Sequence, residues 1–280
     1  MAALFIFCAV FLATSSCDAA KLISDIVYRT RSDQQLRLDI YTPDVTTVSC
    51  PMVLMFHGGG WTEGDKIYHG YIGPVLADMG IIAISANYRL APVYKYPDCV
   101  TDCQAALKWI RKNGAIYGGD PTRIALLGES AGGHLASLVG LIDSRGAGAG
   151  KNKKAPAVRG VVDIVGPSDL TVFYEHLPVR ALLFQWFGFS PYTKPRPYRS
   201  ASPMTYVNSN SCPFVIIHGT LDSVVPVAHA QNLHNALVSA GVSSQLVLLV
   251  GADHGWAPDS QHAIDAMTAT VNFLKARLLD

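Results

Sequence analysis

Six apolar segments without polar alternation constrain the fold of this 280-residue chain more than any other feature of its sequence. A strand with one face in solvent alternates apolar and polar residues, whereas a strand covered on both faces reads as a continuous apolar run. We therefore predict a set of strands that are buried on both faces of a sheet. They are residues 52–56, 81–85, 124–127, 158–165, 214–217 and 245–250.

Two further patterns complete the predicted architecture. Residues 36–41 alternate in period two and residues 23–29 supply a matching partner, so we expect an antiparallel pair at the start of the sheet. Strands that alternate with helices predict an α/β fold with a mostly parallel, roughly eight-stranded sheet and helices on both faces. Apolar stripes at helical spacing occupy residues 100–110, 135–142, 230–240 and 264–278.

The composition indicates a single globular domain that acts on a small molecule. Half of the residues are apolar and the formal net charge is +1, which excludes a disordered chain and gives no basic field to attract nucleic acid. No linker divides the sequence, so we assign residues 21–280 to one domain. We expect a small, mostly uncharged molecule as the partner and leave the oligomeric state open.

Residues 1–20 have the features of a secretory signal peptide. Residues 2–13 are apolar all round, small polar residues follow them, and Ala19-Ala20 suits a cleavage site. We therefore predict a secreted, extracellular protein that begins near Ala20 or Lys21. No later run reaches the roughly 18 apolar residues of a membrane span, so we expect no stable membrane insertion.

Cysteine and histidine spacing predicts no metal site. Four cysteines stay in the predicted mature chain, where an oxidising compartment permits disulfides, and their possible pairings are left open. The cysteines lack metal-site spacing and the two histidines lack a companion ligand, so we expect neither a metal nor a cofactor. These residues are Cys50, Cys99, Cys103, Cys212, His229 and His234.

A predicted nucleophile lies between an apolar run and a helical stripe, in the segment Gly128-Glu129-Ser130-Ala131-Gly132. In that setting a G-x-S-x-G sequence forms a sharp strand-to-helix turn, which exposes the serine hydroxyl at the end of the strand. The small neighbours permit the turn, and the Ala131 N–H lies at a helix N-terminus. We therefore predict Ser130 as a nucleophile.

A second glycine-rich segment supplies backbone donors. His57-Gly58-Gly59-Gly60 ends an apolar run, and its lack of side chains after the histidine lets N–H groups approach a developing oxyanion. We expect Gly58, Gly59 and Ala131 to form an oxyanion hole. An oxyanion hole beside a serine nucleophile indicates acyl transfer.

Asp222 and His254 are the predicted partners of the serine, because a hydroxyl needs a general base and that base needs a carboxylate. Asp222 follows the run 214–217, and His254 follows the run 245–250. The chain order serine, aspartate, histidine is that of α/β-hydrolases. Because the carboxyl ends of parallel strands share one edge of a sheet, Ser130, Asp222 and His254 should meet there.

Other polar residues near these motifs are weaker candidates. We expect His134 to pack or cap, His218 to be structural at a strand end, and Glu129 to be a buried hydrogen-bond partner. Asp253 adjoins His254 too closely in the sequence to orient its ring. None of the four is therefore assigned a place in the triad.

Two segments interrupt the alternation of strands and helices. Residues 144–156 contain three glycines and three lysines but lack the pattern of a phosphate loop, so we expect a mobile surface loop. Residues 168–207 are rich in aromatic residues and proline, and form either core or a small cap that lines a pocket. Trp61 and Tyr68 present the same choice between core packing and an acyl pocket.

At these motifs the chain resembles the hormone-sensitive-lipase-like branch of α/β-hydrolase esterases, over about residues 36–274. The resemblance implies the triad and oxyanion roles assigned above. The short, nearly capless form is closer to feruloyl and acetyl-xylan esterase-like (BD-FAE-like) members, in a group that includes kynurenine formamidases and prenylcysteine methylesterases. Two departures are Glu129, where the lipase-like branch commonly has Asp, and the lack of a large N-terminal cap. The matching residues are His57-Gly58-Gly59-Gly60, Asn87-Tyr88-Arg89-Leu90-Ala91-Pro92, Gly128-Glu129-Ser130-Ala131-Gly132-Gly133 and His218-Gly219-Thr220-Leu221-Asp222.

The resemblance and the triad together predict a carboxylesterase, a serine hydrolase that cleaves small or aryl esters through an acyl-enzyme. The missing cap favours short acyl chains over triglycerides. The same residues permit an arylformamidase of the kynurenine formamidase type or a peptidase. A non-catalytic binding protein on the same fold is the remaining alternative.

Overall fold

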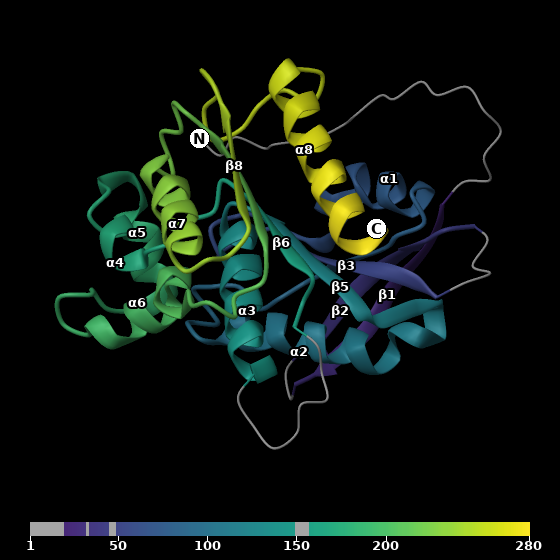
Figure 1. The fold of residues 1–280 in the computed structure, drawn as a ribbon. Coiled ribbons are helices and arrows are strands. Elements are labelled where there is room, and N and C mark those ends of the chain that lie inside the picture. The colour runs from purple at the N-terminus through teal and green to yellow at the C-terminus, as the bar shows by residue number, and fades with distance from the viewer. Residues whose placement is uncertain (1–19, 32–33, 45–48, 149–156) are drawn as a thin grey trace.

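The strands form one sheet in the part of the chain that the computed structural model describes, which is residues 20–31, 34–44, 49–148 and 157–280 (Figure 1). Residues 1–19 of the predicted signal peptide lie outside the described residues. The strands are β1 (Lys21–Thr30), β2 (Gln35–Thr42), β3 (Cys50–Phe56), β4 (Ile82–Ala86), β5 (Gly119–Glu129), β6 (Gly160–Ile164), β7 (Phe214–Gly219) and β8 (Ser244–Leu249).

The directions of the strands agree with the sequence-based prediction. Across the described residues the sheet has eight strands in the order β1-β2-β4-β3-β5-β6-β7-β8. β1 pairs antiparallel with β2, and β2 pairs antiparallel with β4. Every pairing from β4 through β8 is parallel. The antiparallel opening pair and the mostly parallel sheet are therefore confirmed.

Helices separate most of the parallel strands. The four predicted helical stripes correspond to α2, α3, α7 and α8 in the list that follows, and only Ala240 of the third stripe lies outside its helix, one residue after the end of α7. The described helices are α1 (Gly73–Asp78), α2 (Asp98–Asn113), α3 (Ala131–Gly148), α4 (Leu170–Phe173), α5 (Leu177–Phe187), α6 (Pro195–Ala201), α7 (Ala228–Ser239) and α8 (Gln261–Leu278), with short 3-10 helices η1 (Lys66–Tyr71), η2 (Gly114–Tyr117) and η3 (Pro203–Tyr206).

The central strands are covered on both faces, which explains their continuous apolar sequences. Met52 and Leu54 of β3 pack into one apolar cluster with α2, α3 and α7. Val53 and Met55, which point the opposite way, pack with α1 and α8 in a second cluster. All four side chains are fully buried. Figure 1 shows α1 and α8 on one side of the sheet and α2 and α3 on the other.

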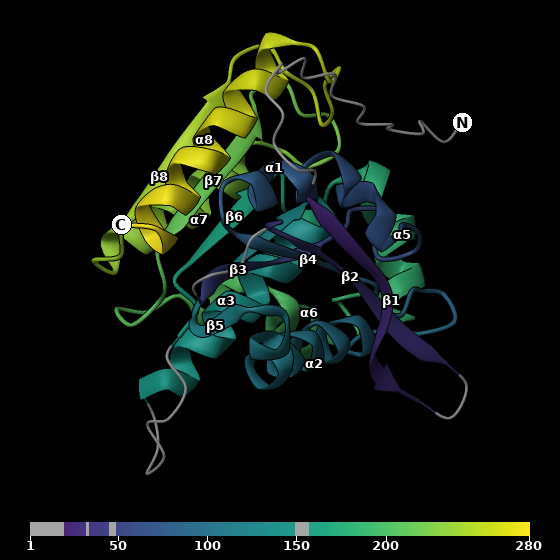
Figure 2. The same cartoon turned by 90° about the vertical axis from the view of Figure 1, so that its right-hand side faces the viewer.

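Two of the sequence-based predictions were wrong in part. The run 245–250 read as a strand buried on both faces, but β8 is an edge strand, with Leu248 38% and Val250 80% exposed (Figure 2). Apolar side chains alone therefore did not distinguish an edge strand from a central one. Residues 144–148, expected in a loop, complete α3. Residues 149–156 lie outside the described residues.

The aromatic segment 168–207 folds into short helices between β6 and β7, namely α4, α5, α6 and η3. It has a core of its own, in which the rings of Phe187 and Tyr198 stack with centroids 3.9 Å apart. Trp186 is also buried, and its ring stacks on Trp61 at 4.3 Å. Part of the segment is thus buried core, and part of it packs against the loop that follows β3.

Cys99, Cys103 and Cys212 are buried, free thiols within the described part of the chain, and Cys50 is also buried. Burial raises the pKa of Cys99 well above its usual value, which keeps this thiol protonated. Among the described helices none is both long and apolar enough to cross a bilayer.

Candidate active site

Ser130 occupies a sharp turn between β5 and α3, with a left-handed φ of 55°. The Ser130 N–H donates to the carbonyl of Ile164 at 2.8 Å, which ties the turn to β6. A Cβ on Gly128 would lie 2.2 Å from the Gly132 carbonyl oxygen, and one on Gly132 would lie 1.9 Å from that of Phe56. Only glycine fits at both positions, so the G-x-S-x-G spacing follows from backbone packing.

The structure brings the three predicted triad residues into one hydrogen-bonded row. The Ser130 Oγ is 2.9 Å from His254 Nε2, and His254 Nδ1 is 2.8 Å from Asp222 Oδ2. Ser130 follows β5, Asp222 follows β7 and His254 follows β8, so all three lie at the carboxyl edge of the sheet. This arrangement allows the histidine to accept the serine proton while the carboxylate holds the opposite ring nitrogen.

Asp222 is held as an anion by hydrogen bonds. Its Oδ1 accepts from the backbone N–H groups of Val224 at 2.9 Å and Val225 at 2.7 Å. Burial alone would raise the pKa of Asp222, but hydrogen bonds from His218 and His254 bring that pKa well below its usual value. The carboxylate is therefore charged across the neutral pH range.

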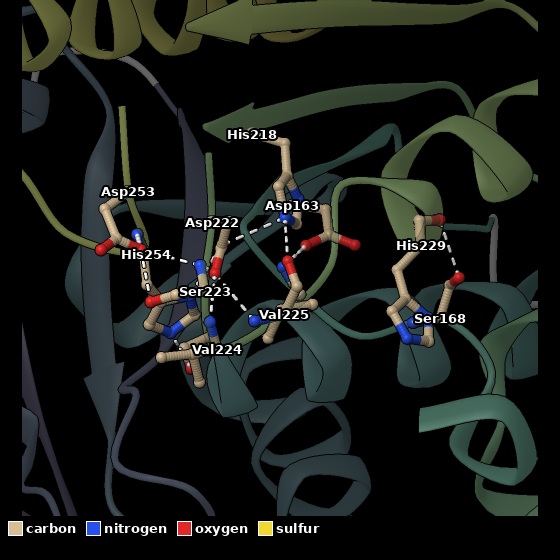
Figure 3. A network of polar contacts seen from close by, with 12 residues as sticks. Asp163, Ser168, His218, Asp222, Ser223, Val224, Val225, His229, Asp253 and His254 are labelled. Atoms are coloured by element: carbon tan, nitrogen blue, oxygen red, sulfur yellow. Dashed lines mark hydrogen bonds and ion pairs between the residues drawn. The ribbon is translucent and has the colours of Figure 1, made fainter. Parts of the chain in front are cut away.

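His218 is a functional neighbour that sequence reasoning missed. Its Nε2 lies 3.1 Å from Asp222 Oδ2 and 2.8 Å from the carbonyl of Val225, so this nitrogen carries a proton that both oxygens accept. Figure 3 shows Asp222 between the rings of His254 and His218. The i, i+4 spacing of His218 and Asp222 was the available signal, and it was interpreted as a structural strand end.

Asp253 contacts the site through the backbone and not through the imidazole. Its Oδ1 accepts from the backbone N–H of His254 at 2.7 Å and from both the N–H and the hydroxyl of Ser223 at 2.8 Å. Asp253 therefore joins the loop after β8 to the loop after β7. Asp222 has the contact with the His254 ring, as expected from the sequence.

The glycine loop after β3 lies against the serine turn. A Cβ on Gly58 would lie 3.6 Å from the Ser130 Cβ, so the two backbones approach closely. Gly59 has a φ of +107°, and a Cβ there would lie 2.2 Å from the Glu63 carbonyl oxygen. Gly58 and Ala131 therefore lie beside Ser130, and the role of Gly58, Gly59 and Ala131 as oxyanion donors stays a prediction. A side chain on Gly59 would strain the loop.

Trp61 fixes this loop to the helices on either side. Its indole Nε1 donates to His134 Nδ1 at 3.2 Å, and His134 Nε2 donates to the carbonyl of Ala201 at 2.7 Å. Burial lowers the pKa of His134 to about 4, so the ring is neutral and can accept from the indole. Trp61 is therefore core, whereas Tyr68 is 44% exposed. His134 packs, as expected.

Segment 168–207 contacts both sides of the site. A Cβ on Gly60 would lie 2.7 Å from Leu182 Cδ2, so α5 rests on the glycine loop. On the other side His176 Nε2 donates to the carbonyl of Ser223, next to Asp222, at 3.0 Å. The described residues contain no group of three or more His, Cys, Asp or Glu side chains that could hold a metal ion.

The eight-stranded sheet, with the serine turn at its carboxyl edge, defines an α/β-hydrolase fold in the described residues. The chain belongs to the BD-FAE family, whose model matches residues 38–237.

Several known proteins are similar to this chain. The probable carboxylic ester hydrolase LipM of Mycobacterium tuberculosis (strain ATCC 25618 / H37Rv) is 35% identical over 82% of this chain and 53% of its own length. The esterase LipQ of the same strain is 32% identical over 89% and 58%. A truncated carbohydrate esterase from gut microbiota has a TM-score of 0.76 at 25% identity, covering 94% of this chain and 98% of that one. The chain spans a little over half the length of the two curated relatives.

Proposed function

We propose that this protein is a carboxylic ester hydrolase that acts through a Ser130, His254 and Asp222 triad. The observation that carries the proposal is the unbroken row from the Ser130 Oγ to His254 at 2.9 Å and on to Asp222 at 2.8 Å. The names of the similar proteins, a carboxylic ester hydrolase and an esterase, support the same class of reaction.

The reaction proceeds through an acyl-enzyme. The Ser130 hydroxyl attacks the ester carbonyl carbon while its proton passes to His254 Nε2, and the carbonyl oxygen becomes an oxyanion. The N–H groups of Gly58, Gly59 and Ala131 stabilise that oxyanion. The bond to the alcohol oxygen then breaks, and His254 gives its proton to the departing alcohol.

Water completes the cycle in the same way. A water molecule gives a proton to His254 and attacks the acyl carbon, and the bond to the Ser130 oxygen breaks as that oxygen takes the proton back. Asp222 stabilises the imidazolium in both halves. The low pKa of Asp222 keeps its charge in place for this purpose.

We propose small or aryl esters with short acyl groups as the substrates, because α5 rests on the glycine loop through Leu182. One experiment tests the class of reaction. Purified protein is treated with a fluorophosphonate probe, then assayed on p-nitrophenyl acetate, N-formylkynurenine and a dipeptidyl anilide. We expect Ser130-dependent labelling and the highest kcat/KM on the acetate. Higher kcat/KM on the amide substrates would favour a formamidase or peptidase, and absence of labelling would indicate a binding protein.

We also propose that the protein is secreted and that residues 1–20 are removed. Residues 2–13 are apolar all round, and β1 begins at Lys21, so cleavage there leaves the sheet complete. N-terminal sequencing of protein from the culture medium should give a start near Ala20 or Lys21. Protein that keeps Met1 and stays in the cells would contradict this.

A further inference from the structure

Glu129 places a carboxyl group one residue before Ser130, and the triad does not use it; its side chain is 21% exposed. Its Oε1 accepts a hydrogen bond from the hydroxyl of Tyr71, and its Oε2 faces His69 Nε2 at 3.8 Å. Tyr71 and His69 both belong to η1, which follows the glycine loop. The carboxyl therefore sits between the serine turn and η1, the 3-10 helix that follows the glycine loop.

The hydrogen bonds around His69 determine where its ring proton lies. The Ser85 hydroxyl donates its hydrogen to the carbonyl of Lys66 at 2.7 Å. The Ser85 oxygen is also 2.6 Å from His69 Nδ1, so at this contact the hydroxyl accepts and Nδ1 donates. A neutral His69 thus carries its proton on Nδ1, and Nε2 presents a lone pair.

That lone pair faces the Glu129 carboxyl. His69 Nε2 is buried and has no hydrogen-bond partner among the described residues. If Glu129 were ionised, lone pairs of its Oε2 would face the lone pair of His69 Nε2, which is unfavourable. If Glu129 is protonated on Oε2, its hydrogen can point toward that nitrogen instead. Burial raises the pKa of Glu129 to about 7, against the hydrogen bond from Tyr71, and burial lowers the pKa of His69 to about 3. Below about pH 7 the proton therefore resides on Glu129 and not on His69.

We propose that Glu129 is held as a neutral acid, with its proton directed at His69 Nε2, and that its ionisation slows acyl transfer at Ser130. The second half rests on the proposed function. Glu129 acts here as a positioning residue that keeps negative charge away from the oxyanion loop.

Topology explains why a charge on Glu129 opposes the reaction. In the sheet, β3 and β4 lie on one side of β5, and β7 and β8 lie on the other. The Glu129 carboxyl contacts η1, between β3 and β4, on the side of the glycine loop. His254 approaches from the loop after β8. An anion at Glu129 would therefore lie on the glycine-loop side of Ser130, where the proposal requires it to repel the oxyanion more than it attracts the imidazolium.

The other titratable groups close to this pair do not offset such a charge. Burial lowers the pKa of His57, at the end of β3, to about 4. Burial also holds the pKa values of Tyr71 and of Tyr88, after β4, well above the usual range. All three are neutral near pH 7, so ionisation of Glu129 adds an unbalanced charge.

The test is the substitution Glu129→Gln. The amide oxygen can accept from Tyr71 and the amide nitrogen can donate to His69, so glutamine reproduces the protonated acid and cannot ionise. We expect kcat of the wild type on p-nitrophenyl acetate to fall by roughly threefold to tenfold from pH 7 to pH 9, and kcat of Glu129→Gln to lose this fall. The matched control is Glu175→Gln. Like Glu129, Glu175 accepts a hydrogen bond from a tyrosine, Tyr192, but this pair lies at the surface. Its pH profile should follow the wild type.

Thermal unfolding tests the proton without any assay of activity. Because the pKa of Glu129 is raised on folding, its contribution to stability is complete below the unfolded pKa and is lost as pH rises through about 7. The Tm of the wild type should therefore fall, relative to Glu129→Gln, by about 5 °C or more between pH 5 and pH 8. Should Glu129→Gln fail to fold, Tyr71→Phe supplies the test, because removing the donor should move the alkaline limb to higher pH.

The outcomes separate the two proposals. Parallel Tm curves for the wild type and Glu129→Gln, or an alkaline limb that Tyr71→Phe leaves unmoved or shifts to lower pH, would overturn the neutral-acid assignment. Parallel pH profiles of kcat with divergent Tm curves would overturn the effect on acyl transfer alone. If the wild type cleaves no ester, the proposed function fails, and the Tm comparison still decides where the proton lies.

Discussion

At the scale of single residues, the site depends on the two hydrogen bonds of the His254 ring and on the negative charge of Asp222. His254 lies 2.9 Å from the Ser130 Oγ on one side and 2.8 Å from Asp222 on the other. Because Asp222 also accepts from His218 and from two backbone N–H groups, it is held in place without His254. Serine and histidine therefore act as one unit, with aspartate as its support.

Substitution of the triad tests this division of roles. We expect Ser130→Ala and His254→Ala each to reduce kcat by roughly 10⁴ to 10⁶, with a smaller loss for Asp222→Asn. The double variant Ser130→Ala with His254→Ala should be barely slower than either single variant, because the second change removes a group that has nothing left to act on. Steady-state kinetics on a short-chain ester measures the losses.

Folding must be checked beside these rates, because Ser130 lies at a left-handed φ of 55° and its replacement can alter stability. Far-UV circular dichroism and thermal unfolding serve as controls. A folded Ser130→Ala protein that keeps most of the wild-type activity would show that another group is the nucleophile.

The acid limb of activity should report a single proton. The pKa of Asp222 lies well below its usual range, so this carboxylate stays charged as the pH falls from 8 to 4. Protonation of His254 removes the base, so log(kcat/KM) should fall with a slope of about one on the acid side. A flat profile from pH 5 to 8, or a slope of two, would contradict this assignment. The same pH profile is measured for Asp222→Asn, which has no carboxylate at this position, and is compared with that of the wild type.

At the scale of elements, the sequence predicted the strands and helices whose apolar residues follow the regular pattern that burial requires. Strands β3, β4, β6 and β7 and residues 124–128 of β5 are buried on both faces, and their continuous apolar runs identified them. The helices α2, α3, α7 and α8 each bury one apolar stripe and were predicted for that reason. The burial of β8 was predicted wrongly, because its apolar sequence suggested a strand covered on both faces, whereas β8 lies at the edge of the sheet and is only partly buried.

The parts that the sequence did not predict depend on contacts between distant segments. Segment 168–207 forms short helices, and α4 has only four residues, too few to establish a helical period. The triad positions could be predicted, because each triad residue lies in or beside a short motif that directly follows a predicted strand. The second donor on Asp222 and the pairing of Glu129 with His69 depend on tertiary packing, which local patterns do not contain.

Helix α5 should limit the length of the acyl group. Leu182 lies against the glycine loop, where a Cβ on Gly60 would come within 2.7 Å of it. We expect faster turnover of C2 and C4 than of C16 p-nitrophenyl esters. Leu182→Ala opens space beside the loop and should raise the ratio of C8 to C4 kcat/KM by severalfold, on the order of 1 kcal/mol for the removed carbon atoms.

The matched control is Leu177→Ala in the same helix, because the Leu177 side chain is 72% exposed. This variant should leave the C8 to C4 ratio unchanged. Equal ratios in both variants, or a wild type that prefers C16, would mean that the acyl group binds elsewhere.

At the scale of the whole molecule, two clusters of ion pairs attach the antiparallel pair β1 and β2 to the rest of the domain. Lys66 of η1 reaches Asp39 of β2 at 3.0 Å and Asp25 of β1 at 3.1 Å. In the second cluster Arg29 of β1 binds Asp102 of α2. The edge of the sheet next to the glycine loop is thus fixed by charge as well as by strand pairing.

Asp102 should be the most sensitive charged residue for global stability. Its fully buried carboxylate accepts from Arg89 Nε at 2.7 Å and from Arg29 at 2.7 Å, so it joins α2, the segment after β4, and β1. Asp102→Asn leaves the mostly buried Arg89 guanidinium with only the partly exposed Asp98, at 3.0 Å, as its counter-charge, and we expect a loss of about 3 kcal/mol in the free energy of unfolding. The matched control is Asp120→Asn, which breaks the partly exposed pair with Arg123 and should cost less than about 1 kcal/mol. Urea unfolding followed by both circular dichroism and tryptophan fluorescence measures the two losses and checks that the transitions coincide. Equal, small losses in both variants would show that the strand pairing alone holds this edge.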